Sequence, residues 1–292
     1  MRLPTVTIKQ LLEAGVHLGH KTFRWNPKMS KYIFGSKNTV HIIDLTQTLE
    51  MVNSALVEIH KCVSSGGKLL FVSTKKQASD AVLNLAKDTS QFFVNHRWLG
   101  GMLTNWNTIS NSIKKYKQLT ESLKKENTGF TKKENLKMGI QRDKLERSLG
   151  GIAEMKKIPD MIFIIDTNVE DLAVKEAIKL NIPIVAIIDT NSDPTGINHP
   201  IPGNDDARRA INLYCDLIKH TILDAQKGIN QTDNKDLVDK KNKDNKEDIQ
   251  TKDNSVNLKE ADIQNKSIKI VVEKKTKSIF SKIKSLASKK SK

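Results

Sequence analysis

Three nearly continuous apolar runs place the strongest constraint on what this chain can fold into. They cover residues 68–74, 160–166 and 182–189. Runs of this kind are typical of strands that are buried on both faces, as in parallel sheets. Shorter runs at residues 41–45 and 92–95 predict two further strands. All of these runs are far shorter than the ~20 apolar residues of a membrane-spanning helix, so the sequence predicts no membrane partner.

Helical patterns alternate with these strands. Apolar residues recur at steps of three and four from Leu45 to Val63, which predicts an amphipathic helix that ends at the following Ser-Gly-Gly. Further helices are expected near residues 78–86, 169–180 and 205–227. Alternating strands and helices indicate an α/β fold, in which helices cover both faces of a parallel sheet. We therefore expect residues 1–228 to form one α/β domain.

Residues 105–152 interrupt the alternation and predict an inserted helical hairpin. The first helix has an apolar stripe at coiled-coil spacing, made of Ile109, Ile113, Tyr116, Thr120 and Leu123. After a turn at residues 127–130, Thr131 and Glu134 form a capping-box pattern that opens a second helix. The stripe of this second helix consists of Met138, Leu145, Leu149 and Ile152. The hairpin is either packed only on itself or a projecting arm that contacts RNA or protein.

The charge of the chain favours a polyanionic partner. The 49 Lys and Arg exceed the 33 Asp and Glu, which gives a net charge of +16. Residues 1–228 carry +9, and the hairpin residues 107–149 alone carry 11 basic and 5 acidic side chains. Residues 229–263 carry −2 and residues 264–292 carry +9. The polar composition from residue 229 onward predicts a disordered, low-complexity extension over 229–292, either a nucleic-acid tail or a solubilising one.

The remaining composition excludes several classes of protein. The two cysteines, Cys62 and Cys215, are too few for a fold held together by disulfides, and they form no metal-ligand cluster. The first residues contain no apolar signal segment, so we expect a soluble, cytoplasmic protein. The Gly-Gly before Lys68 precedes a strand, whereas a phosphate-binding loop follows one, so it is interpreted as a helix stop.

Acidic residues follow two of the predicted strands and leave two interpretations open. Asp166 and Asp189 each begin an Asp-Thr-Asn sequence, and Asp193 lies nearby. Ligands bind at the carboxyl ends of parallel strands, so these residues could hold Mg²⁺ in a receiver-type or phosphatase-type enzyme. Alternatively, they shape turns and cap helices. Residues 201–207 are similarly expected to start the last helix, with Asn204 as its cap.

Cations interleaved with aromatic and turn residues predict a surface for RNA, because they can neutralise phosphates and stack on bases. One such segment, residues 17–31, contributes His17, His20, Lys21, Arg24, Trp25, Asn26, Lys28 and Lys31. A second comprises Arg97 and Trp98, next to paired glycines. We add the hairpin lysines and the arginines that flank the last helix: Lys114, Lys115, Lys132, Lys133, Arg208 and Arg209. Packing of Trp25 and Trp98 in the protein interior is the alternative for the two tryptophans.

These same segments resemble the bacterial form of the small-subunit ribosomal protein two family. The matching segments occur in order over most of residues 3–226 and are together very specific. They are residues 11–20, 25–29, 32–35, 41–45, 97–105, 148–151, 159–160, 166–168 and 201–207. Within 74–77 a Lys stands where the family often has Arg, which keeps the charge and loses the bidentate fork. The extension from residue 229 onward is not part of the family pattern.

The resemblance implies a flavodoxin-like α/β/α fold with five parallel strands and a coiled-coil hairpin. It implies a structural role without catalysis. We assign no cofactor and no metal-binding residue, and whether any structural metal is bound stays open. Its expected partners are small-subunit ribosomal RNA at the head–body junction and neighbouring ribosomal proteins, including the large mRNA-binding protein one, rather than DNA. The alternative, from the residues alone, remains a Mg²⁺-dependent α/β enzyme that uses Asp166 and Asp189.

Overall fold

A computed structural model describes residues 3–124 and 131–228. Its helices are α1 (Ile8–Ala14), α2 (Leu45–Ser64), α3 (Ser79–Thr89), α4 (Trp106–Lys124), α5 (Lys132–Leu149), α6 (Asp171–Lys179) and an unlabelled helix over residues 208–228. Its short 3₁₀ turns are η1 (Thr22–Arg24), η2 (Pro27–Tyr32) and η3 (Gly150–Ile152). The predicted turn at 127–130 and the extension 229–292 lie outside the described residues.

The main sheet has five parallel strands in the order β5-β4-β6-β7-β8. These strands are β4 (Leu69–Val72), β5 (Phe92–Val94), β6 (Met161–Ile165), β7 (Ile184–Ile188) and β8 (His199–Pro202). When the five strands of this sheet are numbered 1 to 5 along the chain, their order across the sheet is 2-1-3-4-5, which is the flavodoxin-like strand order. The parallel α/β/α architecture predicted from the sequence is therefore confirmed.

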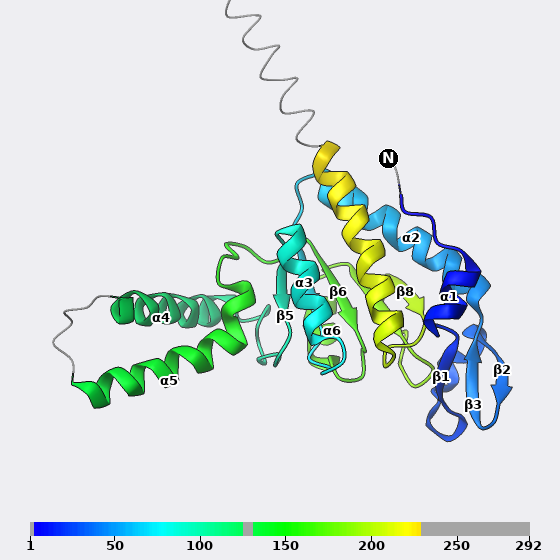
Figure 1. Cartoon of the computed structure of the whole chain (residues 1–292), viewed down its shortest axis with the longest axis horizontal. Coiled ribbons are helices and arrows are strands. Elements are labelled where there is room, and N and C mark those ends of the chain that lie inside the picture. Colours follow the sequence, from blue (N-terminus) through cyan, green and yellow to red (C-terminus); the bar gives the residue numbers. More distant parts are fainter. Residues whose placement is uncertain (1–2, 125–130, 229–292) are drawn as a thin grey trace, which may run out of the picture. The chain divides into compact units, whose positions relative to one another are not determined.

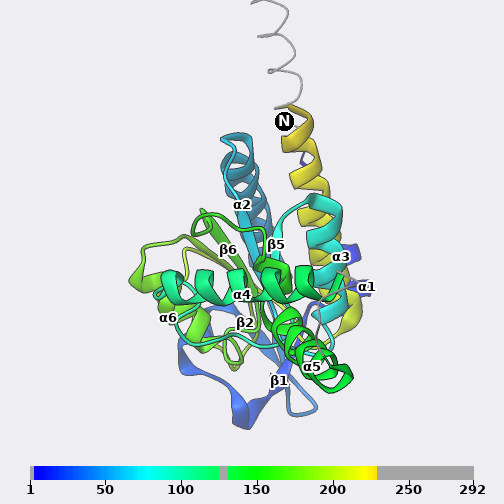
Figure 2. The same ribbon diagram turned by 90° about the vertical axis from the view of Figure 1, so that its left-hand side faces the viewer.

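Two cores sandwich this sheet. Alternate residues of the strands, such as Phe71 and Phe163, face α1, α2, α3 and helix 208–228. The residues between them, such as Leu70 and Ile164, face α6, η2 and the base of the hairpin. Figure 2 shows the sheet between α6 on one side and α3 on the other. Strands β4, β6 and β7 are buried along their whole length, which explains why their sequences are apolar without alternation.

One of the strands predicted for the parallel sheet belongs instead to a second, antiparallel sheet. Residues 41–45 were expected to join the parallel sheet, but β3 (Val40–Ile43) pairs with β1 (Leu18–Lys21) and β2 (Ile33–Lys37) instead. The turn between β2 and β3 has positive φ at Asn38 and Thr39, as tight hairpins require. The fifth parallel strand is β8, whose residues overlap the segment 201–207 that was expected to start a helix. The helix begins at residue 208 instead.

Two predicted helix boundaries, the stop at Gly66-Gly67 and the capping box at Thr131, are confirmed, and the structure adds a cap at Asp44. The side chain of Asp44 accepts a hydrogen bond from the backbone N–H of Thr46 at the start of α2. After this helix, Gly66 adopts φ of 79° and the N–H of Gly67 donates to the carbonyl of Cys62, so the Gly-Gly is a helix stop. Thr131 and Glu134 form the expected capping box of α5.

Helices α4 and α5 pack against each other and form the inserted hairpin (Figure 1). The predicted stripe of α4 lies on its less exposed face, and Ile109 and Ile113 are buried at the base. Coiled-coil packing of the two helices stays a prediction. At the base, a Cβ on Gly151 would lie 2.1 Å from the carbonyl oxygen of Phe93, so only glycine lets η3 approach β5 this closely.

Candidate nucleic-acid interface

The predicted basic–aromatic segment is fixed to the carboxyl edge of the main sheet. The backbone N–H of Asn26 donates to the carbonyl of Thr190 after β7, at 2.8 Å. The N–H of His20 donates to the hydroxyl of Thr190 at 2.9 Å. A Cβ on Gly19 would lie 2.6 Å from the methyl group of Thr190, so this close approach requires glycine. The segment thus covers the strand ends where open α/β sheets usually bind ligands.

The outer side of this segment displays cations and aromatic rings. Lys21, Arg24, Lys28 and Lys31 are exposed, and Trp25 is 41% exposed. The guanidinium of Arg24 lies 5.5 Å from the ring centre of Phe23, which is itself 73% exposed. The Lys31 ammonium lies 4.7 Å from the ring of Tyr32, which is itself buried and not available for stacking. Exposed rings paired with cations can stack on bases while neutralising phosphates.

Three residues predicted for this surface are turned at least partly inward, and two of them, His20 and Asn26, have side-chain hydrogen-bond partners within the chain. The Nδ1 atom of His20 lies 2.8 Å from a carboxylate oxygen of Asp189, and the hydrogen bond to that carboxylate raises the pKa of His20 against the effect of burial. The Nδ1 atom of His17 is buried. The side chain of Asn26 accepts a hydrogen bond from the backbone N–H of Lys28 at 3.0 Å and so shapes the turn.

Arg97 is exposed, but Trp98 is not available on the surface. Trp98 is 7% exposed and its indole N–H donates to the carboxylate of Glu176 on α6, at 3.1 Å. The same carboxylate accepts hydrogen bonds from the backbone N–H groups of Gly101, Leu103 and Thr104, and from the Thr104 hydroxyl, at 2.7–3.1 Å. Base stacking by Trp98 is therefore not supported, because its ring is buried.

Glu176 was not predicted from the sequence, although a signal exists. It lies on the buried side of α6 among Ala173, Val174 and Ala177, where a charged residue interrupts an apolar stripe. Burial on its own would raise the pKa of Glu176, but hydrogen bonds from Thr104, Leu103, Trp98 and Gly101 hold it below the usual value. The carboxylate therefore stays ionised and anchors the loop that carries Arg97.

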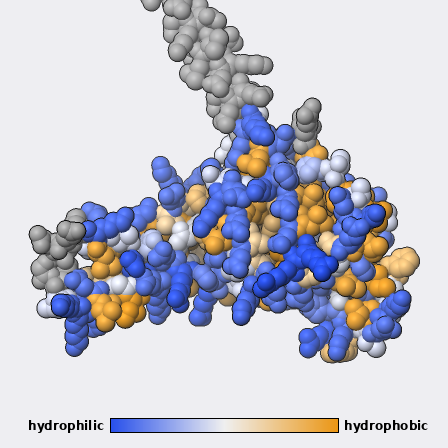
Figure 3. Space-filling model, viewed as in Figure 1, coloured by the Kyte–Doolittle hydropathy of each residue, from blue (hydrophilic) through white to orange (hydrophobic). Residues whose placement is uncertain are grey.

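The hairpin displays the remaining predicted lysines at the opposite edge of the sheet from the segment 17–31 (Figure 1). Lys114 and Lys115 on α4, and Lys132 and Lys133 in the first turn of α5, are all exposed. Figure 3 shows a largely hydrophilic hairpin with an apolar patch near the start of α5. Leu136 and Ile140, one turn apart on α5, are 67% and 63% exposed.

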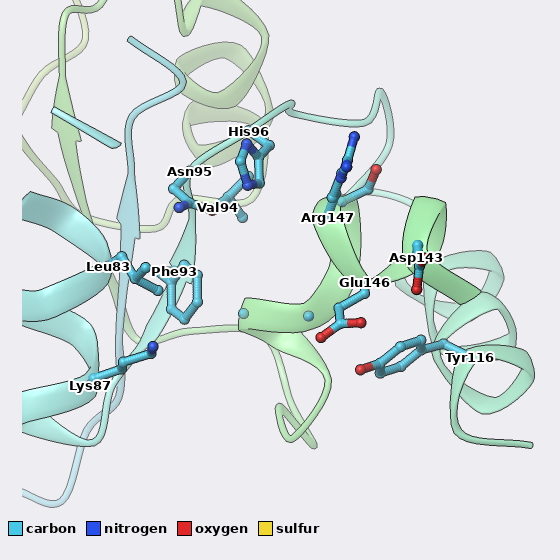
Figure 4. A pocket seen from close by; sticks show the side chains of 13 residues that line it. Leu83, Lys87, Phe93, Val94, Asn95, His96, Tyr116, Asp143, Glu146 and Arg147 are labelled. Atoms are coloured by element: carbon cyan, nitrogen blue, oxygen red, sulfur yellow. The ribbon is translucent and has the colours of Figure 1, made fainter. Parts of the chain in front are cut away.

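A cavity of about 580 Å³ lies where the hairpin meets the domain. Figure 4 shows Lys87 and Phe93 on one side of it and Tyr116 and Glu146 on the other. His96 and Arg147 also line it. Its lining mixes acidic and basic side chains, so it shows no preference for an anion.

The acidic residues of the alternative Mg²⁺ interpretation have other partners in the structure. Asp193 is exposed and pairs with Lys28 at 2.7 Å, and that hydrogen bond lowers the pKa of Asp193 to about 2. The ammonium of Lys75, which follows β4, pairs instead with Asp166, Asp205 and Asp206 at 3.0, 2.8 and 2.6 Å. The other oxygen of Asp166 accepts from the N–H groups of Asn168 and Val169, which supports its interpretation as a turn residue.

Asp205 is the least exposed member of this cluster. Burial, followed by the charges of Asp166 and Asp189, raises its pKa to about 7 despite the nearby Lys75. Asn204, expected to cap the last helix, accepts from the N–H groups of Asp206 and Ala207 and shapes the turn before it. Arg208 and Arg209 follow, both exposed, on the same edge of the sheet as the segment 17–31.

Across residues 3–124 and 131–228, no helix is long and apolar enough to cross a membrane.

Comparisons with known proteins identify the family. The family model described as ribosomal protein S2 matches residues 11–225. The chain is 55% identical over 239 residues to a small ribosomal subunit protein uS2 of Parvibaculum lavamentivorans, covering 82% of this chain and 93% of the relative. It is 58% identical over 224 residues to proteins of the same name from Chelativorans sp. and Acidiphilium cryptum, which covers 77% of this chain and 84% and 88% of those relatives. The chain belongs to the ribosomal protein S2 family, whose members are structural proteins of the small ribosomal subunit.

Proposed function

We propose that this chain binds small-subunit ribosomal RNA through two separate basic surfaces. The first, the N-terminal surface, consists of Lys21, Arg24, Lys28 and Lys31 with Arg208 and Arg209. The second, the arm surface, consists of Arg97 and the hairpin lysines Lys114, Lys115, Lys132 and Lys133. The observation that carries the proposal is that every one of these side chains is exposed, while three of the acidic residues near the first surface, Asp166, Asp189 and Asp205, are buried.

Phosphate contacts by these cations would supply affinity, and the positions of the two surfaces would select the shape of the RNA. The aromatic side chains Phe23 and Trp25 add rings on which an unpaired base can stack. We also propose a location at the head–body junction of the subunit, which the family resemblance supports. The enzymatic alternative loses its support, because Asp166 pairs with Lys75 and Asp189 with His20.

Charge reversal of the N-terminal surface tests this role. The triple substitution Lys21→Glu, Arg24→Glu and Lys28→Glu is expected to weaken binding of the chain to small-subunit RNA and its incorporation into subunits. If each cation contacts one phosphate, the slope of log K against log salt falls by about 2–3. The measurement is a filter-binding titration at several salt concentrations, together with sedimentation of assembled subunits.

A control reverses three lysines elsewhere, the exposed Lys9 and Lys61 and the half-buried Lys219, each of which pairs with an acidic neighbour. The control variant is expected to retain most of the slope of log K for RNA binding against log salt concentration. Normal incorporation of the Lys21, Arg24 and Lys28 variant at physiological salt contradicts the proposal.

We also propose that the arm contributes to docking of the large mRNA-binding protein one. The exposed pair Leu136 and Ile140 supports a protein contact, because two large apolar side chains one turn apart form a small docking stripe. Replacing both with Ser is expected to reduce the amount of protein one retained on purified subunits, while the chain itself stays incorporated. Full retention of protein one on such subunits contradicts this part of the proposal.

A further inference from the structure

The cavity at the base of the hairpin has a balanced charge. Two cations, Lys87 and Arg147, and two carboxylates, Asp143 and Glu146, line it, and all four side chains are exposed. Its volume of about 580 Å³ lies within the range of about 300–1,000 Å³ that is usual for ligand sites. A cavity of this size and charge favours a neutral polar ligand over a free anion or a metal cation.

Two aromatic rings face this cavity from separate elements. Phe93 belongs to β5 and Tyr116 to α4, and Figure 4 shows them on opposite sides of the cavity. Both side chains are half-buried, so part of each ring is accessible. Between the two elements the chain contributes Gly150 and Gly151, and a Cβ on Gly151 would lie 2.8 Å from the Phe93 ring. The glycines thus keep the space beside this ring open for a flat aromatic ligand.

Glu146 provides a hydrogen-bond acceptor between the two rings (Figure 4). The neighbouring carboxylate of Asp143 accepts a hydrogen bond from the guanidinium of Arg142 at 2.9 Å. Within residues 3–124 and 131–228, the carboxylate of Glu146 has no hydrogen-bond or ion-pair partner. A carboxylate with both oxygens available can accept two parallel hydrogen bonds from adjacent N–H groups. Among the RNA bases, guanine presents such a pair on its pairing edge, at N1 and at the N2 amine.

The cavity adjoins the cations of the arm surface. Arg97 directly follows His96, which lines the cavity, and Lys114 and Lys115 directly precede Tyr116 on α4. These cations can hold the phosphates of an RNA strand that passes the base of the hairpin. Proteins read single-stranded RNA through bases that leave the stack and lie against aromatic side chains. A strand held by the arm surface would therefore bring such a base to the cavity.

We propose that the cavity binds one unstacked guanine nucleotide of small-subunit RNA. The base stacks on Phe93 and Tyr116, and Glu146 accepts hydrogen bonds from its pairing edge. The phosphates of the nucleotide and its neighbours stay outside, on the cations of the arm surface. This proposal rests on RNA binding by the arm surface and adds a contact that reads a base, whereas phosphate contacts carry no sequence information.

The substitution Glu146→Gln tests the proposal through the direction of its effect. If Glu146 only lies near phosphates, removing its negative charge strengthens RNA binding. If it accepts two hydrogen bonds from guanine, the substitution weakens binding, by about 5- to 150-fold for the loss of a bidentate base contact. The slope of log K against log salt concentration should stay the same, because no phosphate contact is lost. The measurement is a filter-binding titration of the full-length chain with purified small-subunit RNA.

Two further substitutions serve as controls. Glu50→Gln makes the same change of charge at an exposed glutamate of α2 that does not line the cavity, and it is expected to leave the affinity unchanged. Tyr116→Phe keeps the aromatic ring and is expected to bind RNA like the original chain. Tyr116→Leu removes the ring and is expected to weaken binding by about 5- to 150-fold, as the loss of one stacked base does.

Chemical probing of the bound RNA gives a second measurement. A dicarbonyl reagent that modifies N1 and N2 of unpaired guanines is expected to spare one guanine in the complex with the original chain and to modify it in the complex with Glu146→Gln. Unchanged or tighter binding by Glu146→Gln, or identical guanine protection by the two proteins, overturns the proposal and leaves RNA binding by the arm surface standing. If the original chain does not bind the RNA, the RNA-binding role itself fails, and this proposal fails with it.

Discussion

Replacing Glu176 with alanine is expected to lower the free energy of unfolding by about 3–5 kcal/mol. The reason is that one carboxylate accepts hydrogen bonds from Trp98, Gly101, Leu103 and Thr104. Removing it leaves several of these donors buried without an acceptor, and each such donor costs about 1–3 kcal/mol. Urea denaturation of the two proteins measures the difference.

Glu50→Ala is the matched control, because Glu50 is an exposed glutamate on α2. Its expected effect is within about 0.5 kcal/mol. The difference between the original chain and Glu176→Ala should also depend on pH. Because the folded pKa of Glu176 lies below its usual value of 4.5, its contribution is present above that pH and disappears as the pH falls through the folded pKa. An equal effect of the two substitutions would contradict the role assigned to Glu176.

Replacing Lys75 with methionine is expected to cost a similar amount, about 3–5 kcal/mol. The substitution keeps the apolar length of the side chain but leaves Asp166, Asp205 and Asp206 without their shared ammonium. The loss of stability should grow as the pH rises above neutral. Lys75 lowers the pKa of Asp205, which is about 7 in the original chain, so removing the ammonium raises this pKa further and makes ionisation of the buried carboxyl more costly. Thermal or urea unfolding between about pH 5.5 and pH 8.5, a range that includes the pKa of Asp205, measures both effects.

Lys76→Met is the control for this prediction, because Lys76 is the exposed neighbour of Lys75 in the same loop. Its expected effect is within about 0.5 kcal/mol. If Lys75→Met and Lys76→Met unfold at the same urea concentration, the cluster does not depend on Lys75, and the account of the sheet edge is wrong.

Much of the fold follows from the sequence because burial on both faces leaves a clear pattern. Strands β4, β6 and β7 are apolar throughout, and their prediction is confirmed. Strand β8 (His199–Pro202), which contains two prolines, was missed because residues 201–207 were expected to start the last helix. Proline is compatible with an edge strand, however, and β8 lies at the edge of the sheet. The run at residues 41–45 was misassigned because a short apolar run does not distinguish parallel from antiparallel pairing.

The candidate site was predictable only in part, because exposure depends on partners distant in the sequence. The basic residues of the N-terminal and arm surfaces are exposed, as isolated lysines and arginines usually are. Trp98 is buried because Glu176, 78 positions away, accepts its indole N–H. The same limit applies to His20, whose partner Asp189 is 169 positions away. Neither pairing leaves a local pattern that spacing or composition could reveal.

The proposed role requires the chain to contact small-subunit RNA through the N-terminal and arm surfaces. Mapping of ultraviolet protein–RNA crosslinks on purified small subunits tests it most directly. We predict crosslinks within residues 21–31 and within the hairpin helices α4 and α5, and none at the buried Trp98. Crosslinks confined to other parts of the chain, or recovery of the chain away from small subunits, would contradict the account.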